Sequence, residues 1–106
     1  MTSGGNQKTG YNNFASGYEA LYSNTTGSYN GAAGYQALRN NTAGNGNNAL
    51  GFAALYQNTS GDYNTAFGYE TLYTNTTGTD NNASGYGTLH ANTTGSDNNG
   101  MGVEAL

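Results

Sequence analysis

The chain has 106 residues and a formal net charge of −4 at pH 7, and only 8% of its residues are charged. Two cationic residues, Lys8 and Arg39, are too few to neutralise a row of phosphates, so we exclude nucleic acid as a partner. The chain has no Cys and no apolar run of 18 residues, so we expect no disulfide, no thiolate metal site and no membrane insertion. Met1 is followed by Thr-Ser-Gly-Gly instead of a basic and then an apolar stretch, and we therefore expect no signal peptide in this sequence.

Beyond its first residues the chain repeats with a period of 17. Gly returns at this interval in two series, one from Gly10 and one from Gly17, and two further columns of identical residues run beside them. The Leu column is Leu21, Leu38, Leu55, Leu72, Leu89 and Leu106, and the Asn column is Asn13, Asn30, Asn47, Asn64, Asn81 and Asn98. A strict period of this length is typical of a solenoid.

We therefore predict an all-β fold, a parallel β-solenoid of the β-roll or narrow β-helix type. Residues 1–4 would be a lead-in, and residues 5–106 a single solenoid. Its six 17-residue coils are expected at 5–21, 22–38, 39–55, 56–72, 73–89 and 90–106.

One coil, residues 24–40, shows the elements that we expect in chain order. Asn24-Thr25-Thr26-Gly27 has the composition of a turn. Residues 30–35 alternate small and larger side chains and predict a short strand, and a second short strand is expected over 36–39. A one-turn helix is the alternative for the Gly-Tyr-x-Ala-Leu-Tyr segment, but about six residues are too few for a stable helix.

The repeated columns are the candidate functional elements. We expect the Leu column in the core and the Asn column as an internal ladder of side-chain amides; the alternative for the Asn column is a polar contact row. An aromatic column comprises Tyr18, Tyr35, Phe52, Tyr69 and Tyr86, with Val103 at its end. Because Phe and Val replace Tyr there, we expect packed or half-buried rings that belong to the core and not to a ligand site.

Two further columns are candidates for contact with other molecules. Large side chains with polar tips form the candidate contact face, Tyr22, Arg39, Tyr56, Tyr73 and His90, although a solvated stripe would look the same. The Thr column, Thr25, Thr42, Thr59, Thr76 and Thr93, is the candidate ice-binding face of an alternative function. Its neighbouring column varies between Thr, Ala and Ser, whereas ice-binding solenoids display two regular Thr columns.

Little in the sequence predicts catalysis or cofactor binding. His90 is the only His and has no recurring nucleophile or acid beside it, so we expect no enzyme activity and no cofactor. Asp80 and Asp97 share a column, but calcium needs six to eight oxygen ligands and we expect no metal site. Five N-x-S/T glycosylation acceptors occur, at Asn24, Asn40, Asn58, Asn75 and Asn92, and the turn composition explains them without a glycan.

Two stretches resemble repeats of known fibrous proteins. Asn-x-Ala-x-Gly-x-x-Ala at 30–37 and Asn-Thr-Ala-Phe-Gly-Tyr-Glu-Thr-Leu at 64–72 resemble the head repeats of trimeric autotransporter adhesins. The unit at 64–78 is also similar to repeats of phage tail-fibre proteins. This resemblance, which covers residues 5–106, implies a left-handed parallel β-roll and a homotrimer that forms an adhesive or spacer rod.

These observations predict a non-enzymatic structural or adhesive segment of an extracellular or virion fibre. Its expected partner is itself, through the aromatic and Leu columns, with a ligand on a host surface as a further partner. The first alternative is a self-assembling filament of solenoids stacked end to end, and the second is ice binding. A disordered Asn/Gly/Tyr-rich segment is disfavoured because disorder requires no fixed register.

Overall fold

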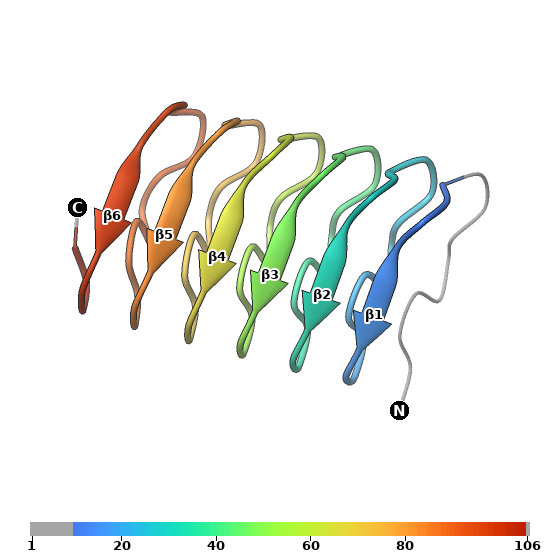
Figure 1. The fold of residues 1–106 in the computed structure, drawn as a ribbon, viewed down its shortest axis with the longest axis horizontal. Coiled ribbons are helices and arrows are strands. Elements are labelled where there is room, and N and C mark those ends of the chain that lie inside the picture. The colour runs from blue at the N-terminus through green and yellow to red at the C-terminus, as the bar shows by residue number, and fades with distance from the viewer. Residues whose placement is uncertain (1–9, 106) are drawn as a thin grey trace.

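The computed structural model describes residues 10–105. The predicted lead-in, the first five residues of the first coil and Leu106 lie outside the described residues. Six strands of three residues each follow one another along the rod (Figure 1). They are β1 (Phe14–Ser16), β2 (Gly31–Ala33), β3 (Asn48–Leu50), β4 (Thr65–Phe67), β5 (Asn82–Ser84) and β6 (Asn99–Met101).

The strands form one parallel sheet in the order β1-β2-β3-β4-β5-β6. Each junction has the same register: Ala15 pairs with Ala32, Ala32 with Ala49, and so on in steps of 17 residues. One sequence repeat is therefore one coil, and the prediction of a parallel β-solenoid is confirmed.

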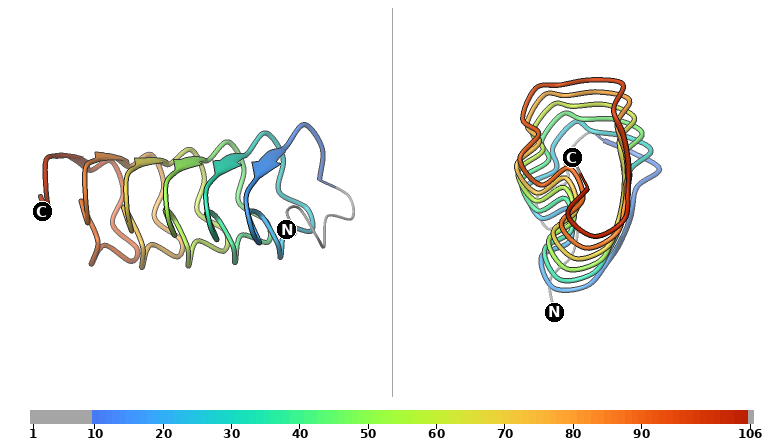
Figure 2. Two further views of the ribbon diagram at one scale, coloured as in Figure 1. Left: turned by 90° about the horizontal axis from the view of Figure 1, so that it is seen from below. Right: turned by 90° about the vertical axis from the view of Figure 1, so that its left-hand side faces the viewer.

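The coil is left-handed. In Figure 1 the strands lie on the near face with their arrows pointing down, while the chain advances from β1 on the right to β6 on the left. The side view of Figure 2 places the strands along one side of the rod, and the end-on view shows successive coils following one another closely. The principal extents are 34 × 24 × 17 Å.

The predicted second strand over 36–39 is wrong, because the chain forms consecutive turns there. Backbone bonds from Ala37 N to Gly34 O (3.3 Å) and from Arg39 N to Gln36 O (3.2 Å) close two overlapping β-turns. Gln36 and Leu38 have φ values of +56° and +52°, the left-handed conformation that a type II turn requires at its third residue. The turns still bond to the neighbouring coils, through Gln36 N to Tyr18 O at 2.8 Å and Leu38 N to Ala54 O at 3.0 Å.

The helix alternative for this segment is also wrong, since residues 10–105 contain no helix. It follows that no helix in the described part of the chain could cross a membrane.

The Asn-Thr-Thr-Gly segment forms the predicted turn and also binds the next coil. Thr25 N, Thr26 N and Gly27 N all donate to the Thr42 carbonyl oxygen, at 3.1, 3.0 and 3.1 Å. A Cβ at Gly27 would lie 2.3 Å from the Gly44 carbonyl oxygen. Only Gly allows this approach between coils, which explains the Gly series that begins at Gly10.

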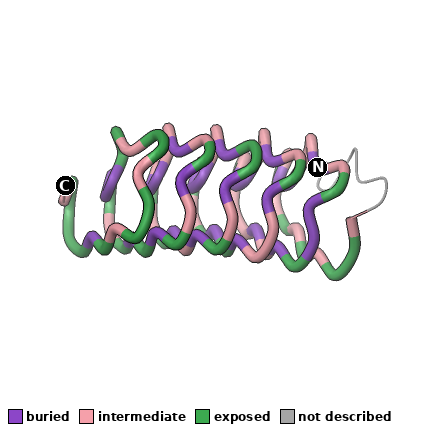
Figure 3. Tube along the Cα trace, turned by 90° about the horizontal axis from the view of Figure 1, so that it is seen from above, coloured by how far each residue is buried: buried purple, intermediate pink, exposed green. Residues whose placement is uncertain are grey.

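The interior is narrow and half polar. Buried Ala and Leu side chains form one cluster that runs along the rod, and Leu21, Leu38, Leu55 and Leu72 have no exposed area. Buried Asn side chains fill the remainder, and every buried side-chain N or O atom among the described residues has a hydrogen-bond partner. Figure 3 shows buried segments recurring in successive coils. Each coil thus buries its polar and apolar side chains against its neighbours.

Candidate functional site

The Asn column lies inside the coil and forms a continuous ladder. Asn64 Nδ2 donates to Asn47 Oδ1 at 3.1 Å and to the Gly78 carbonyl oxygen at 2.8 Å. Its Oδ1 accepts from Asn81 N at 3.0 Å and from Asn81 Nδ2 at 3.1 Å. Asn30, Asn47, Asn64 and Asn81 are buried, and Asn13 and Asn98 are half-buried. The column therefore offers no polar row to an outside partner.

A second buried Asn ladder was not predicted. It consists of Asn24, Asn41, Asn58, Asn75 and Asn92, and Asn58 Nδ2 donates to Asn41 Oδ1 at 2.8 Å and to Gly61 O at 3.0 Å. The sequence signal was the unbroken return of Asn at this position, which we interpreted only as turn composition. Asn24, Asn58 and Asn75 have no exposed area, so in the folded chain these glycosylation acceptors lie inside the coil.

The aromatic column lies on the surface, so the expectation that it belongs to the core is wrong, while the alternative of half-buried rings describes it better. The five rings are 41–52% exposed, and Val103 at the end of the column is 73% exposed. Successive rings stack with centroids 4.9–5.2 Å apart and planes within 12° of parallel. Inner rings cover each other's faces and present their edges to solvent, so each ring face packs against another ring of the same column.

The candidate contact face forms a second stacked column. Tyr73 stacks on Tyr56 at 5.1 Å and on His90 at 5.3 Å, and the Arg39 guanidinium lies 4.6 Å from the Tyr22 ring centroid. Burial raises the pKa of Tyr73, and the nearby Tyr56 and Glu70 raise it further. The members are half-buried except His90, which is exposed. This face is therefore an ordered surface column.

Carboxylates lie between the two ring columns and engage the cation of the contact face. Glu19 Oε1 accepts from Gln36 Nε2 at 2.8 Å and from Arg39 Nε at 3.2 Å. Glu70 Oε1 lies 3.5 Å from His90 Nε2 in the equivalent position three coils on. The pKa of Glu19 is lowered, chiefly by the hydrogen bond from Gln36 and also by Arg39, against a smaller opposing effect of burial.

We expect Gln36→Ala to raise the pKa of Glu19 toward the ordinary Glu value near ~4.3, because it removes the strongest donor to the carboxylate. Ala already occupies this position at Ala53, so the coil should be retained. A carboxyl 13C NMR titration measures the effect, with Arg39→Gln as the comparison that removes the guanidinium group. If only Arg39→Gln raised the pKa, the ion pair and not the amide would be its main cause.

The Thr column directs its hydroxyl groups along the rod. Thr25 Oγ1 donates to Thr42 O at 3.2 Å, and the same bond recurs from Thr42, Thr59 and Thr76 at 3.3–3.4 Å. These hydroxyl hydrogens are engaged with the backbone of the next coil. This engagement disfavours the ice-binding alternative.

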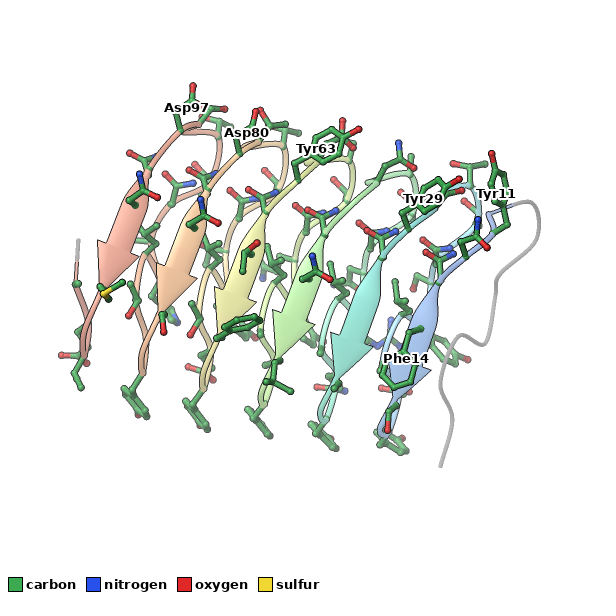
Figure 4. All side chains as sticks on the ribbon, in the orientation of Figure 1. Tyr11, Phe14, Tyr29, Tyr63, Asp80 and Asp97 are labelled. Atoms are coloured by element: carbon green, nitrogen blue, oxygen red, sulfur yellow. The ribbon has the colours of Figure 1, made fainter. Side chains whose placement is uncertain are left out.

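The outer face of the sheet is a surface that the sequence analysis missed. Its first and third strand positions point outward, and its large side chains Phe14, Leu50, Phe67 and Met101 are 63%, 53%, 45% and 84% exposed. None of the strand residues is charged. We call this surface the sheet face; Figure 4 shows Phe14 at one end of it. The available signal was the variable residue before each Gly of the second series.

Small residues at β2 and β5 leave two apolar hollows in the sheet face. Over β5 a hollow of about 180 Å³ lies between Phe67 and Met101, with Ser84 between them. Over β2 a second hollow lies between Phe14 and Leu50, with Ala33 beneath it. The sheet face therefore alternates between apolar projections and recesses.

The remaining polar chemistry is sparse. Asp80 and Asp97 lie on successive coils along the same edge as Tyr29 and Tyr63 (Figure 4). Within residues 10–105, no three His, Cys, Asp or Glu side chains lie close enough together to hold a metal ion. Comparison of this chain with protein-family models, with curated proteins and with solved structures finds no match.

Proposed function

We propose that this chain is a non-enzymatic structural segment of an extracellular or virion fibre in which copies associate through the sheet face. The observation that carries the proposal is the uncharged sheet face with four exposed large apolar side chains, Phe14, Leu50, Phe67 and Met101. Exposed large apolar side chains on an uncharged surface favour association, because burying them removes them from water.

The distribution of charge favours a second copy as the partner. The chain carries a net charge of −4, and its Asp and Glu residues all lie outside the strands. Copies that approach through other surfaces bring like charges together, whereas the sheet face brings none. The resemblance to trimeric adhesin heads supports a homotrimer around this face.

The Leu column, which we expected to mediate association, is buried inside the coil. The Leu column has no exposed area from Leu21 to Leu72, so it cannot form lateral contacts. The aromatic column is exposed and remains available beside the sheet face. The contact face consists of other residues, and we retain it as the candidate surface for a ligand on a host cell.

We expect the chain to sediment as a discrete oligomer and Leu50→Ser/Phe67→Ser to shift it to the monomer. Ser already occupies the third strand position in β1 and β5, so the double variant should fold. Tyr63→Asp is the matched control, because it removes an exposed aromatic side chain and copies Asp80 and Asp97 in the same column. Sedimentation equilibrium measures the masses, and a monomeric parent chain would contradict the proposal.

End-to-end stacking is the second candidate for self-assembly. The five strand junctions have one register, so a coil of another copy is equivalent to the next coil of the same chain. The same sedimentation experiment separates the two cases. End-to-end stacking would give oligomers whose mass keeps increasing with protein concentration. The Leu50→Ser/Phe67→Ser variant would show the same increase.

A further inference from the structure

Three pairs of Tyr residues are stacked across the junctions between adjacent coils. The pairs are Tyr18 with Tyr35, Tyr56 with Tyr73, and Tyr69 with Tyr86. Their ring centroids lie 4.9–5.2 Å apart, and their planes are within 12° of parallel. Both members of a pair occupy the same position in the 17-residue repeat. Each pair therefore holds two phenol rings face to face across one junction.

Tyr is the residue of this chain that one-electron oxidation converts to a radical most readily. The sequence contains 10 Tyr but no Trp and no Cys, the two other residue types that commonly form radicals. A phenol that loses one electron and one proton becomes a tyrosyl radical, whose unpaired electron is shared between the oxygen and the ortho and para ring carbons. Stacking holds a second phenol ring beside it, and proximity of this kind accelerates bond formation.

We propose that Tyr69 with Tyr86, and Tyr18 with Tyr35, are sites of oxidative coupling to dityrosine by a peroxidase that uses hydrogen peroxide. Each phenol gives up one electron and one proton, and the peroxide takes up both electrons and both protons to form two water molecules. The two radicals join through a bond between one ortho carbon (Cε) of each ring. The hydrogen on each of these carbons then leaves as a proton and each phenol oxygen gains one, which restores both aromatic rings.

These two pairs are accessible to an oxidant and separated from each other. Their rings are 41–52% exposed. Phe52 lies between Tyr35 and Tyr69 in the column and stacks on them at 5.1 and 4.9 Å. Phe carries no phenol group, and the residue that follows Tyr86 in the column is Val103. Each radical in the aromatic column therefore has one stacked Tyr as its partner, and coupling joins two adjacent coils.

The third pair, Tyr56 with Tyr73, should couple more slowly. Both residues are half-buried, and burial raises the pKa of the Tyr73 phenol. A phenol that retains its proton more strongly is oxidised less readily, because the radical forms with loss of that proton. The two pairs of the aromatic column are therefore the preferred sites.

Exposure alone would select other residues. Tyr11, Tyr29 and Tyr63 are 59%, 60% and 63% exposed, which is more than any ring of the aromatic column. Tyr11 and Tyr29 meet edge to face at 73°, and no ring contact is found for Tyr63 among residues 10–105. Tyr63 therefore distinguishes a site chosen by stacking from a site chosen by exposure.

The test treats the folded chain with a haem peroxidase and hydrogen peroxide, and then unfolds the product and digests it with a glutamyl endopeptidase. Cleavage after Glu19 and Glu70 separates the two residues of each proposed pair. Mass spectrometry should then find joined peptides that are lighter by two hydrogen atoms than the two peptides together. Fragment spectra should assign these links to the two proposed pairs at least fivefold more often than to any link of Tyr63.

Isotope labelling separates links within one chain from links between copies. Labelled (15N) and unlabelled chains are unfolded and refolded together before oxidation, so that any oligomer contains both. A link within one chain joins peptides of the same isotope, whereas a link between copies also gives mixed pairs. We expect same-isotope pairs only. Predominantly mixed pairs would overturn the proposal, whatever the oligomeric state of the chain.

Tyr86→Phe should abolish the link to Tyr69 and leave the link between Tyr18 and Tyr35. The variant should fold, because Phe52 already occupies this column, and circular dichroism measures whether it does. Tyr63→Phe is the matched control and should leave both links unchanged. Links at Tyr63 as abundant as those between Tyr69 and Tyr86 would overturn the proposal. So would a parent chain without dityrosine under conditions that couple N-acetyl-tyrosine amide.

Discussion

Asn64→Asp is expected to destabilise the fold by about 3–5 kcal/mol at pH 7, because it places an unpaired carboxylate in the buried Asn ladder. The amide Nδ2 of Asn64 donates to Gly78 O and Asn47 Oδ1, and a carboxylate would bring oxygen against both acceptors. Asn64 has no exposed area, so water cannot solvate the charge. Urea unfolding of the variant and the parent chain gives the difference.

The penalty of Asn64→Asp should depend on pH in a defined direction. Burial raises the pKa of the introduced carboxyl in the folded chain above its unfolded value near ~3.9. Below pH ~3.9 both states hold the proton, and the destabilisation is smallest. As the pH rises from there toward the folded pKa, the unfolded chain loses its proton first and the free energy of unfolding falls.

Asn45→Asp is the matched control for this pH series. Asn45 is half-buried, and Asp62 occupies the same position in the next coil, where its Oδ1 accepts from Asn45 N at 2.8 Å. We expect a change within about 0.5 kcal/mol. Equal effects of the two substitutions at pH 7 would show that the Asn column is not an enclosed ladder.

Gly51→Ala should destabilise the fold by about 2–6 kcal/mol, through backbone strain of about 1–3 kcal/mol and a clash of similar size. Gly51 has a φ of +128°, a value that residues with a Cβ rarely adopt. The added Cβ would also lie 2.6 Å from Gly68 O and 2.8 Å from Gly68 C, and these backbone atoms belong to the next coil. Thermal and urea unfolding measure the loss.

Gly102→Ala separates the two causes. Gly102 has a φ of +106°, but nothing lies within 4 Å of an added Cβ. The free energy of unfolding of Gly102→Ala should therefore fall only by the contribution of backbone strain, about 1–3 kcal/mol. If both variants lost the same amount, contact between coils would not be the reason for the Gly at position 51.

The architecture could be predicted because the period is set by contacts between identical residues of adjacent coils. A Leu that stacks on Leu21 must come 17 residues later, so the register is written directly in the sequence. The first strand of each coil was predicted for a similar reason, since its central Ala faces a crowded interior. Residues 31–33 pair with 48–50 as that spacing requires.

The second part of the coil could not be predicted from local propensity. Glu19, Leu21, Gln36 and Leu38 adopt positive φ values, although none of these residue types favours that conformation. Bonds to both neighbouring coils hold them there, for example from Leu21 N to Ala37 O at 3.0 Å. The tertiary ladder thus overrides the intrinsic preference of each residue.

The surfaces were harder to predict than the interior. A column of aromatic residues that tolerates Phe52 in place of Tyr looks like a core, because ordinarily such rings are buried by other elements. Here each ring is covered by the next ring of its own column, so a half-exposed row needs no partner element. The sheet face was missed for the opposite reason: its residues vary from coil to coil and form no column.

The strands contact only their immediate neighbours, β1 with β2, β2 with β3, and so on to β6. The junctions between successive coils are therefore mechanically equivalent. A force that pulls on one end of the rod acts on one junction at a time. Releasing one coil frees 17 residues, which extend by roughly 3.3–3.6 Å each, or about 58 Å in total. A fibre built from this segment would therefore yield by peeling coil by coil, absorbing work over a long extension while the remaining coils keep their fold.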